Sequence, residues 1–277
     1  MIELSNLTFE YPSHDASQFP VLNNINLTLK EGENIGLMGA NGSGKTTFAR
    51  CLNTLLLPTQ GTVFIDGFDT ADAATQSEIR RFVGMVFQNP ENQIVSTTVE
   101  REIAFGLENL GISYEQMHQI VDDMLSLFKL TDYRRHPPHL LSGGEIQRLA
   151  LASVMAMSPK YLVFDEPTSL LDPVSRKHLH SLISKLHADN LSKPAAERLT
   201  TLFITQYPED VLNCDRLLIL HQGRIVFDDL PQVVFENVTA LKKMGVDVPV
   251  EYEVNSYLKD ISGGKISLNT SDFLPIP

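Results

Sequence analysis

The 277-residue chain is predicted to adopt an α/β fold with a mainly parallel sheet, N-terminal antiparallel strands and a helical insertion. Short, mostly apolar runs at 35–38, 160–164 and 201–205 are typical of strands that are covered on both faces. The first run leads directly into the glycine-rich segment GANGSGKTT, as in a strand–loop–helix unit. Between about 90 and 158 the apolar residues instead recur three and four apart, for example within 114–130, which predicts helices.

The ends of the chain have a different pattern. Apolar and polar residues alternate in 2–9 and in 21–29, which predicts half-exposed strands. The runs 217–220 and 224–227 flank Gln222-Gly223 and predict a hairpin, and Asp66-Gly67 predicts a tight turn after a strand at 62–65. The polar stretch 189–198 and the weakly patterned tail after about 236 are expected to be less regular.

Composition excludes several classes of protein. No stretch approaches the roughly 18 apolar residues of a membrane span, so direct lipid insertion is not expected, and the N-terminus lacks the basic and apolar regions of a secretory signal. The net charge of −12 argues against nucleic acid and anionic lipid as partners, so any membrane association is expected to run through another protein. Cys51 and Cys214 are predicted to be buried thiols in a reducing compartment, the cytoplasm.

The strongest motif matches the pattern G-x-x-x-x-G-K-[ST] between a predicted strand and a predicted helix. Its glycines let backbone N–H groups surround phosphate, its lysine reaches the β- and γ-phosphates, and its threonine hydroxyl can bind Mg²⁺. A chance glycine-rich turn is disfavoured by the flanking elements. The sequence therefore predicts an ATP·Mg²⁺ site formed by Gly39, Ala40, Asn41, Gly42, Ser43, Gly44, Lys45, Thr46 and Thr47.

A second signal is the apolar run 161–164 followed by Asp165 and Glu166. The carboxyl end of a buried strand is where open α/β sheets bind ligands. Asp165 is expected to hold Mg²⁺, together with Thr46, and Glu166 to polarise the attacking water. An apolar strand that ends in two acids is common by itself, so this interpretation depends on the phosphate loop.

The segment Leu-Ser-Gly-Gly-Glu at 141–145, followed by Ile-Gln-Arg, closely resembles the LSGGQ signature of the ATP-binding-cassette (ABC) family. A small-residue turn at the start of a helix forms an anion cradle. In that family the cradle faces the γ-phosphate held by the opposite subunit, so the resemblance implies a head-to-tail dimer with two ATP molecules between the chains. The residues expected to reach the partner's ATP are Ser142, Gly143, Gly144, Glu145 and, in the D-loop, Asp172.

Other family motifs match position by position. Tyr11 matches the aromatic residue that stacks on adenine, and Gln88 matches the Q-loop glutamine that contacts Mg²⁺ and the lytic water. By resemblance, residues 1–235 are expected to form the ATP-binding domain, with a helical subdomain at about 90–158. Residues 236–277 are expected to form a C-terminal extension that either completes the dimer interface or is a poorly ordered end.

Two positions depart from the family pattern. Gln206 stands where a histidine usually contacts the γ-phosphate, and Glu145 stands where glutamine is usual. Glutamine can donate one hydrogen bond but cannot carry positive charge. We therefore expect ATP binding, a catalytic group of Glu166, Gln88 and Gln206, and slow hydrolysis that a non-identical partner ATPase would complement.

The stretches QNPENQ at 88–93 and TVEREIAFGLEN at 98–109 are similar to the ATPases of energy-coupling factor importers, including the cobalt and nickel group. This resemblance implies two ATPases, in a homodimer or a heterodimer, on a transmembrane coupling protein with a substrate-capturing membrane protein. The subunit would lie peripherally at the cytoplasmic face of the membrane. Glu100 and Glu102 are expected either to meet arginines of the coupling protein or to form a solvated helix face.

Two other functions remain open at this stage. A soluble ABC ATPase of DNA repair or translation would usually have long coiled-coil insertions or two cassettes, and neither is present. A degenerate or regulatory cassette with weak turnover is supported mainly by Gln206. The transported substrate, a vitamin or a transition-metal ion, is not identified by the sequence.

Overall fold

The structure, a computed structural model, describes residues 1–12, 20–194 and 198–262. An antiparallel sheet in the order β2-β1-β4-β5 consists of β1 (Ile2–Phe9), β2 (Leu22–Leu29), β4 (Gln60–Ile65) and β5 (Phe68–Asp69). A second sheet in the order β10-β9-β3-β8-β7-β6 consists of β3 (Asn34–Met38), β6 (Val83–Val86), β7 (Tyr161–Asp165), β8 (Thr200–Ile204), β9 (Arg216–His221) and β10 (Arg224–Asp229).

The second sheet is mainly parallel, as the apolar runs predict. Strands β6, β7, β8, β3 and β9 pair in parallel, and only β10 is antiparallel to its neighbour. Gln222 and Gly223 join β9 to β10 with φ values of 49° and 75°, which fits the two-residue hairpin turn expected there. The parallel strands carry their loops at the same edge, where polar side chains from several loops can converge.

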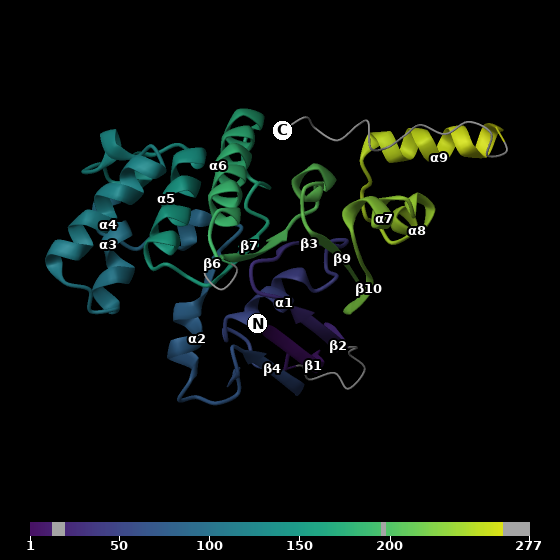
Figure 1. Cartoon of the computed structure of the whole chain (residues 1–277), viewed down its shortest axis with the longest axis horizontal. Coiled ribbons are helices and arrows are strands. Elements are labelled where there is room, and N and C mark those ends of the chain that lie inside the picture. The colour runs from purple at the N-terminus through teal and green to yellow at the C-terminus, as the bar shows by residue number, and fades with distance from the viewer. Residues whose placement is uncertain (13–19, 195–197, 263–277) are drawn as a thin grey trace.

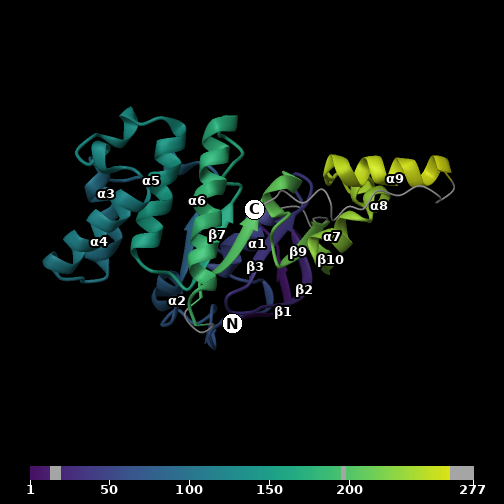
Figure 2. The ribbon, with the colours of Figure 1, turned by 45° about the horizontal axis from the view of Figure 1, so that its top comes forward.

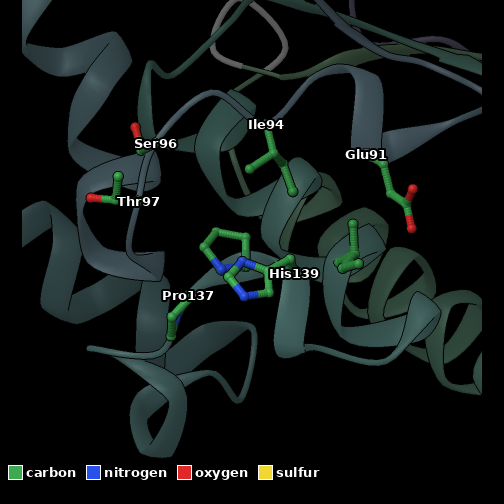
Figure 3. Close-up of a pocket in the computed structure, with 8 residues that line it drawn as sticks. Glu91, Ile94, Ser96, Thr97, Pro137 and His139 are labelled. Carbon is green, nitrogen blue, oxygen red and sulfur yellow. The ribbon is translucent and has the colours of Figure 1, made fainter.

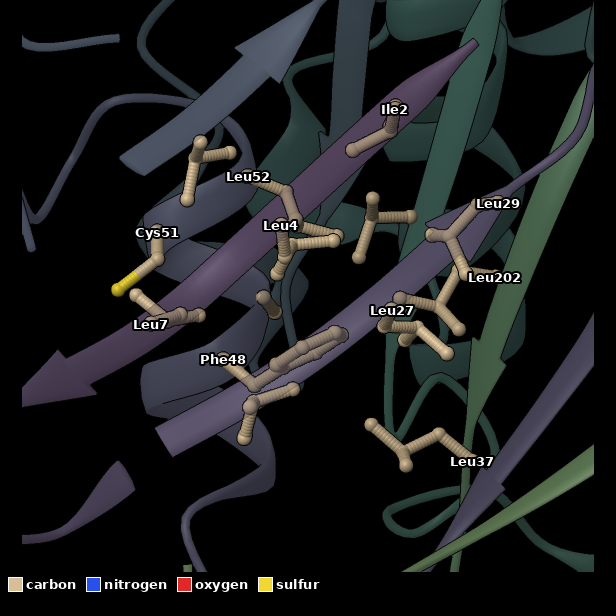
Figure 4. Packing of buried hydrophobic residues seen from close by; sticks show 14 of the residues in the cluster. Ile2, Leu4, Leu7, Leu27, Leu29, Leu37, Phe48, Cys51, Leu52 and Leu202 are labelled. Atoms are coloured by element: carbon tan, nitrogen blue, oxygen red, sulfur yellow. The ribbon is translucent and has the colours of Figure 1, made fainter. Parts of the chain in front are cut away.

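Helix α1 (Lys45–Leu52) lies between the two sheets and forms the centre of the core. Phe48, Cys51 and Leu52 of this helix pack in one cluster with apolar residues of β1 and of the parallel sheet (Figure 4). Burial of these side chains anchors the start of α1 next to the end of β3. Cys51 and Cys214 are both free and buried, as expected, and burial raises the pKa of the Cys51 thiol to about 12.

The helical region packs against the part of the parallel sheet formed by β6, β7 and β8. It comprises α2 (Gln76–Phe82), α3 (Val99–Asn109), α4 (Tyr114–Leu127), α5 (Gly143–Ala156) and the short 3₁₀ helices η1 (Pro90–Asn92), η2 (Thr131–Tyr133) and η3 (Pro138–Leu140). After β7 the chain forms α6 (Pro173–Leu191), and after β8 the 3₁₀ helix η5 (Pro208–Val211). Figures 1 and 2 show α3, α4 and α5 gathered at one end of the molecule.

Two stretches that were expected to be less regular are in part helical. Within 189–198 the residues 192–194 and 198 form neither helix nor strand, as expected, and residues 195–197 lie outside the described residues. Helix α6 continues through Leu191, and the Asn190 amide exchanges hydrogen bonds of 2.7 Å and 2.6 Å with the backbone of Leu199. Beyond residue 230 the chain forms α7 (Pro231–Phe235), α8 (Val238–Lys243) and α9 (Val250–Ser262) at the opposite end from α3–α5 (Figure 1). Helices α7 and α8, of 5 and 6 residues, are too short for a clear periodic signal, and all three helices pack in a buried cluster with β9. Residues 263–277 of the predicted tail lie outside the described residues.

Candidate functional site

The loop between β3 and α1 has a backbone path that requires glycine. Gly42 and Gly44 have φ values of 76° and 108°, and a Cβ on Gly39 would lie 2.3 Å from the Leu220 carbonyl oxygen. The Ser43 hydroxyl is buried and has no hydrogen-bond partner within the described chain, so it is left available to a ligand. Because the loop ends at the N-terminus of α1, its N–H groups can hold an anion.

Lys45 is a buried cation at the end of this loop, with 5% of its surface exposed. Its Nζ donates to the carbonyl oxygens of Gly39 at 2.8 Å and Ala40 at 3.2 Å, and it lies 3.6 Å from Glu166 Oε1. Burial lowers the pKa of Lys45, and the attraction of Glu166 opposes that shift. The ammonium is therefore poised beside the anion cradle with its charge only partly compensated.

Asp165 ends β7 and is buried directly beside α1. Thr46 Oγ1 donates to Asp165 Oδ1 at 3.1 Å, and burial raises the pKa of this carboxyl. A carboxylate and a hydroxyl supply hard oxygen ligands of the kind that Mg²⁺ prefers. The described residues contain no cluster of three or more His, Cys, Asp or Glu that could hold a metal ion. Thr46 and Asp165 thus fit a cation that takes its other ligands from phosphate and water.

Glu166 is the point at which three predicted site residues meet. Its Oε2 accepts hydrogen bonds from Gln206 Nε2 at 2.9 Å and from Gln88 Nε2 at 3.2 Å, while Lys45 approaches Oε1. Glu166 has a φ of 50°, a left-handed conformation that is costly for a residue with a side chain and that directs its carboxylate out of the strand. The arrangement can orient a water molecule and accept its proton.

A cavity of about 390 Å³ lies between the phosphate loop and these side chains. It brings together most of the residues that the sequence predicted for ATP binding and catalysis. Its lining is formed by Val21, Asn41, Gly42, Gly44, Lys45, Thr46, Thr47, Gln88, Glu166 and Gln206. Val21 was not predicted for the site, because an isolated valine in an alternating strand has no distinctive signal.

Tyr11 lies close to the same loop. Its hydroxyl is 3.2 Å from Thr47 Oγ1, and its ring packs edge-on against Phe9 with centroids 4.9 Å apart. The side chain is still 45% exposed. One face of the ring can therefore receive a planar group at the rim of the site.

The remaining predicted residues are not part of this cavity. Ser142, Gly143, Gly144 and Glu145 form the start of α5, and Asp172 caps α6 by accepting from the backbone N–H groups of Val174 at 2.9 Å and Ser175 at 3.1 Å. A Cβ on Gly144 would lie 2.5 Å from Ser175 Oγ, so the starts of the two helices are in contact.

Glu145 forms a capping box with Ser142. Its Oε2 accepts from Ser142 N at 2.8 Å and from Ser142 Oγ at 2.7 Å. Burial by itself would raise the pKa of Glu145, but hydrogen bonds from Tyr133 and Ser142 lower it. The resemblance assigns the Ser142 hydroxyl to the partner's ATP, but here this hydroxyl is hydrogen-bonded to a carboxylate of its own chain.

The two acids of α3 have partners inside the chain, contrary to both expectations for Glu102. Glu102 is 4% exposed, and its carboxylate accepts from the N–H groups of Val95 at 3.0 Å and Ser96 at 2.8 Å. Glu100 pairs with Arg134 at 2.7 Å. The loop before α3 folds back over the helix, and its N–H groups at Val95 and Ser96 donate to this buried carboxylate, a pairing that no local pattern reveals.

Two larger cavities flank this loop. One, of about 540 Å³, is lined by Glu91, Ile94, Ser96, Thr97, Pro137, Pro138, His139 and Ile146, with Ile94 and His139 facing each other across it (Figure 3). The other, of about 530 Å³, lies between α2 and α3 and is lined in part by Arg80, Arg81, Phe105 and Asn109. Sequence reasoning placed only α3 at such a groove, because the other segments come together only in the folded chain.

Comparison with known proteins identifies the family. The family model described as ABC transporter matches residues 22–169. The chain is 41% identical to the energy-coupling factor transporter ATP-binding protein EcfA1 of Clostridium novyi over 278 residues, which span 100% of this chain and 95% of that protein. It is 42% identical to the cobalt import ATP-binding protein CbiO of Syntrophus aciditrophicus over 273 residues, 99% of this chain and 93% of that protein.

Solved structures agree in fold. CbiO1 of Clostridium perfringens, described as part of the ABC transporter complex CbiONQ, gives a TM-score of 0.75 at 27% identity and covers 91% of this chain and 97% of that one. The dimeric ATP-binding cassette MJ0796 bound to ADP and phosphate gives 0.73 at 28% identity, with coverage of 83% and 99%.

The fold and the site define an ABC-type ATPase, an enzyme that binds ATP and couples its hydrolysis to transport. The chain belongs to the ABC transporter family, among the energy-coupling factor ATP-binding proteins. Among residues 1–12, 20–194 and 198–262, none of the helices has the length and apolarity needed to cross a membrane.

Replacing Asp165 by Asn is expected to separate stability from ligand binding. Because burial raises the pKa of Asp165, the folded wild-type protein loses stability relative to the variant as pH rises from about 4, the ordinary Asp value, through the raised pKa. The nucleotide-free variant should therefore melt no lower than wild type at pH 7.5. It should also lose most of the extra stabilisation by ATP·Mg²⁺ over ATP alone, which can reach about 2.7 kcal/mol at 100 times Kd. Thermal melts at several pH values measure both effects, and a variant that melts lower only at high pH contradicts the prediction.

Glu102→Ala is expected to reduce the free energy of unfolding by about 1–3 kcal/mol, because two backbone N–H groups lose a charged acceptor that is itself buried. The exposed Glu108 of the same helix provides the control, and Glu108→Ala should stay within about 0.5 kcal/mol of wild type. Urea titration measures both. Equal stability of the two variants would contradict this structural role and would favour contacts of Glu102 with a partner protein.

Proposed function

We propose that this chain powers a membrane importer of the energy-coupling factor type, with Glu166 as the residue that activates water. The observation that carries the proposal is the convergence of Lys45, Gln88 and Gln206 on the Glu166 carboxylate, directly above the phosphate loop. The names of the relatives EcfA1 and CbiO support an importer rather than another ABC function.

The residue roles follow from the site. The loop from Gly39 to Thr47 would bind the phosphates, and the exposed face of Tyr11 would stack on adenine. Lys45 would turn from its carbonyl acceptors toward the β- and γ-phosphates, which offer a stronger charge partner. Thr46, Asp165 and Gln88 would hold Mg²⁺, which supplies Lewis-acid stabilisation of phosphate charge when bound.

Glu166 would accept the proton of the attacking water, whose position is set by the amides of Gln88 and Gln206. Gln206 donates a neutral hydrogen bond to this carboxylate, where a protonated histidine would add positive charge. The site is therefore expected to bind ATP well and to hydrolyse it slowly.

Pairing with a second ABC ATPase, the same chain or a different one, would complete the site. In support, the residues Ser142, Gly143, Gly144, Glu145 and Asp172 lie outside this chain's own cavity, so they are left for a partner's ATP. The start of α5 would exchange the internal bond between Ser142 and Glu145 for the partner's phosphate. Hydrolysis would remove that bridge and reopen the dimer.

We further propose that a transmembrane coupling protein docks over the two cavities beside α3, and that it also carries a substrate-capturing membrane protein. Both cavities adjoin the loop that follows Gln88, so docking of the coupling protein over them could be transmitted to Glu166. In support, CbiO1, a structural relative, is described as part of the ABC transporter complex CbiONQ. The chain would then lie peripherally on the cytoplasmic face, with 1–235 as ATPase domain, about 90–158 as its helical subdomain and 236–277 as a C-terminal extension.

A second candidate function is a regulatory cassette that closes on ATP with little turnover. One observation favours it: the group that meets Glu166 from the switch is the neutral amide of Gln206. In that case the partner ATPase would supply nearly all of the hydrolysis.

Glu166→Gln tests the proposed ATPase directly. The variant should retain ATP affinity, lose turnover by roughly 100-fold or more, and accumulate as a closed dimer with ATP·Mg²⁺, because the cradle remains while the base is absent. Phosphate release and size-exclusion chromatography measure these effects. Glu236→Gln, an exposed acid outside the site, is the control. Undiminished turnover in Glu166→Gln would rule out the assigned base.

Gln206→His tests the effect of the switch residue. A histidine at this position is expected to raise turnover of the purified homodimer several-fold, because an imidazole can share positive charge with the phosphate and Glu166. ATP turnover at saturation compares the two proteins. Equal rates would mean that Gln206 does not limit hydrolysis and would remove the main support for the regulatory cassette.

A further inference from the structure

A buried acid follows the switch residue by four positions. The Asp210 side chain is 1% exposed, and both of its oxygens are engaged. Oδ2 accepts from Thr205 Oγ1 at 2.6 Å and from Thr168 Oγ1 at 2.8 Å, while Oδ1 lies 2.7 Å from His180 Nε2. A carboxylate is costly to bury unless donors surround it, so this cluster holds its members in one arrangement.

Each partner of Asp210 belongs to a different segment of the site. Thr205 is the residue before Gln206, and Thr168 is two residues after Glu166. His180 lies on α6, the helix that begins next to the signature turn. Asp210 therefore links the segment that carries Gln206 to the segment that carries Glu166. The side chains of these two residues are joined by a hydrogen bond of 2.9 Å.

The Thr205 hydroxyl fixes the backbone on both sides of Gln206. It donates to Asp210 and accepts from the N–H of Tyr207 at 3.0 Å. The Tyr207 ring is in turn covered by the Arg176 guanidinium at 3.8 Å from its centroid, and Arg176 also donates to the Thr168 carbonyl at 3.4 Å. The peptide that carries the Gln206 side chain is thus held from two directions.

We infer that Asp210 is a positioning residue for ATP hydrolysis, which acts through Thr205 to aim the Gln206 amide at Glu166. Glutamine has three rotatable side-chain bonds, so its amide reaches one point reliably only if the backbone beneath it is fixed. Thr168 fixes the turn after Glu166 to the same carboxylate. This inference rests on the proposed roles of Glu166 and Gln206.

A set of variants separates positioning from stability. Thr205→Val removes the hydroxyl at nearly constant shape, Thr205→Ser retains it, and Asp210→Ala removes the acceptor. Asp215→Asn is the control, because this exposed carboxylate accepts from Asn34 N at 2.9 Å at the opposite end of β3. Asp210→Ala is also made in a Gln206→Ala background. For each full-length protein, kcat, KM and the Kd for ATP are measured.

Positioning predicts that Thr205→Val and Asp210→Ala lower kcat by roughly 10- to 100-fold, with Kd for ATP within about threefold of wild type. Thr205→Ser should restore most of the turnover, and Asp215→Asn should match wild type. In the Gln206→Ala background, Asp210→Ala should lower kcat by less than about twofold, because the group that it positions is already absent.

Two results would overturn the inference. One is an undiminished effect of Asp210→Ala in the Gln206→Ala background, and the other is a Gln206→Ala variant with wild-type turnover. Both leave the ATPase assignment intact as long as Glu166→Gln abolishes turnover. Turnover that survives Glu166→Gln would instead refute the proposed function itself.

Discussion

The site depends on one constraint, the burial of three ionisable groups at a single edge of the parallel sheet. Lys45, Asp165 and Glu166 are all withdrawn from water there. Desolvation lowers the pKa of Lys45 and raises that of Asp165, so the fold holds both groups in their charged forms at a cost. A polyanion with a divalent cation supplies the opposite charges, and ligand binding is favoured because the protein has already desolvated its own groups.

The sheet order explains how distant segments meet at this edge. In the order β3-β8-β7-β6, the phosphate loop follows β3 and Gln206 follows β8. Asp165 ends β7, Glu166 directly follows it, and Gln88 follows β6. Because these strands are parallel, all four connections emerge on the same side. Glu166 directly follows the strand that lies between those leading to Gln88 and Gln206, so it receives both amides. Asp210 adds a second layer, which ties the segments behind these side chains to each other.

The two halves of the proposed ATP site differ in how far they are available to a nucleotide in this structure. The phosphate-loop half is formed within one chain, whereas the signature turn is closed on itself by the bonds between Ser142 and Glu145. An approaching phosphate would have to compete with a carboxylate that has a lowered pKa and stays ionised. Under the proposed function, this bond and the neutral Gln206 would make closure and hydrolysis separate steps that a partner subunit could influence.

Sequence alone determined the fold class, the phosphate loop, the paired acids and the family, because each of these depends on local spacing. Glycines at 39, 42 and 44 are required by the backbone path of one loop, and an apolar run that ends in two acids predicts a strand end. Tertiary structure decided what depends on contacts between remote segments. Glu102 was expected either at a partner's surface or on a solvated helix face, yet its carboxylate accepts from the loop before its own helix. Helices α7 to α9 pack in a cluster with β9 that brings together segments remote in sequence. The cluster at Asp210 joins residues 168, 180 and 205, whose proximity arises only when β7, α6 and β8 pack together.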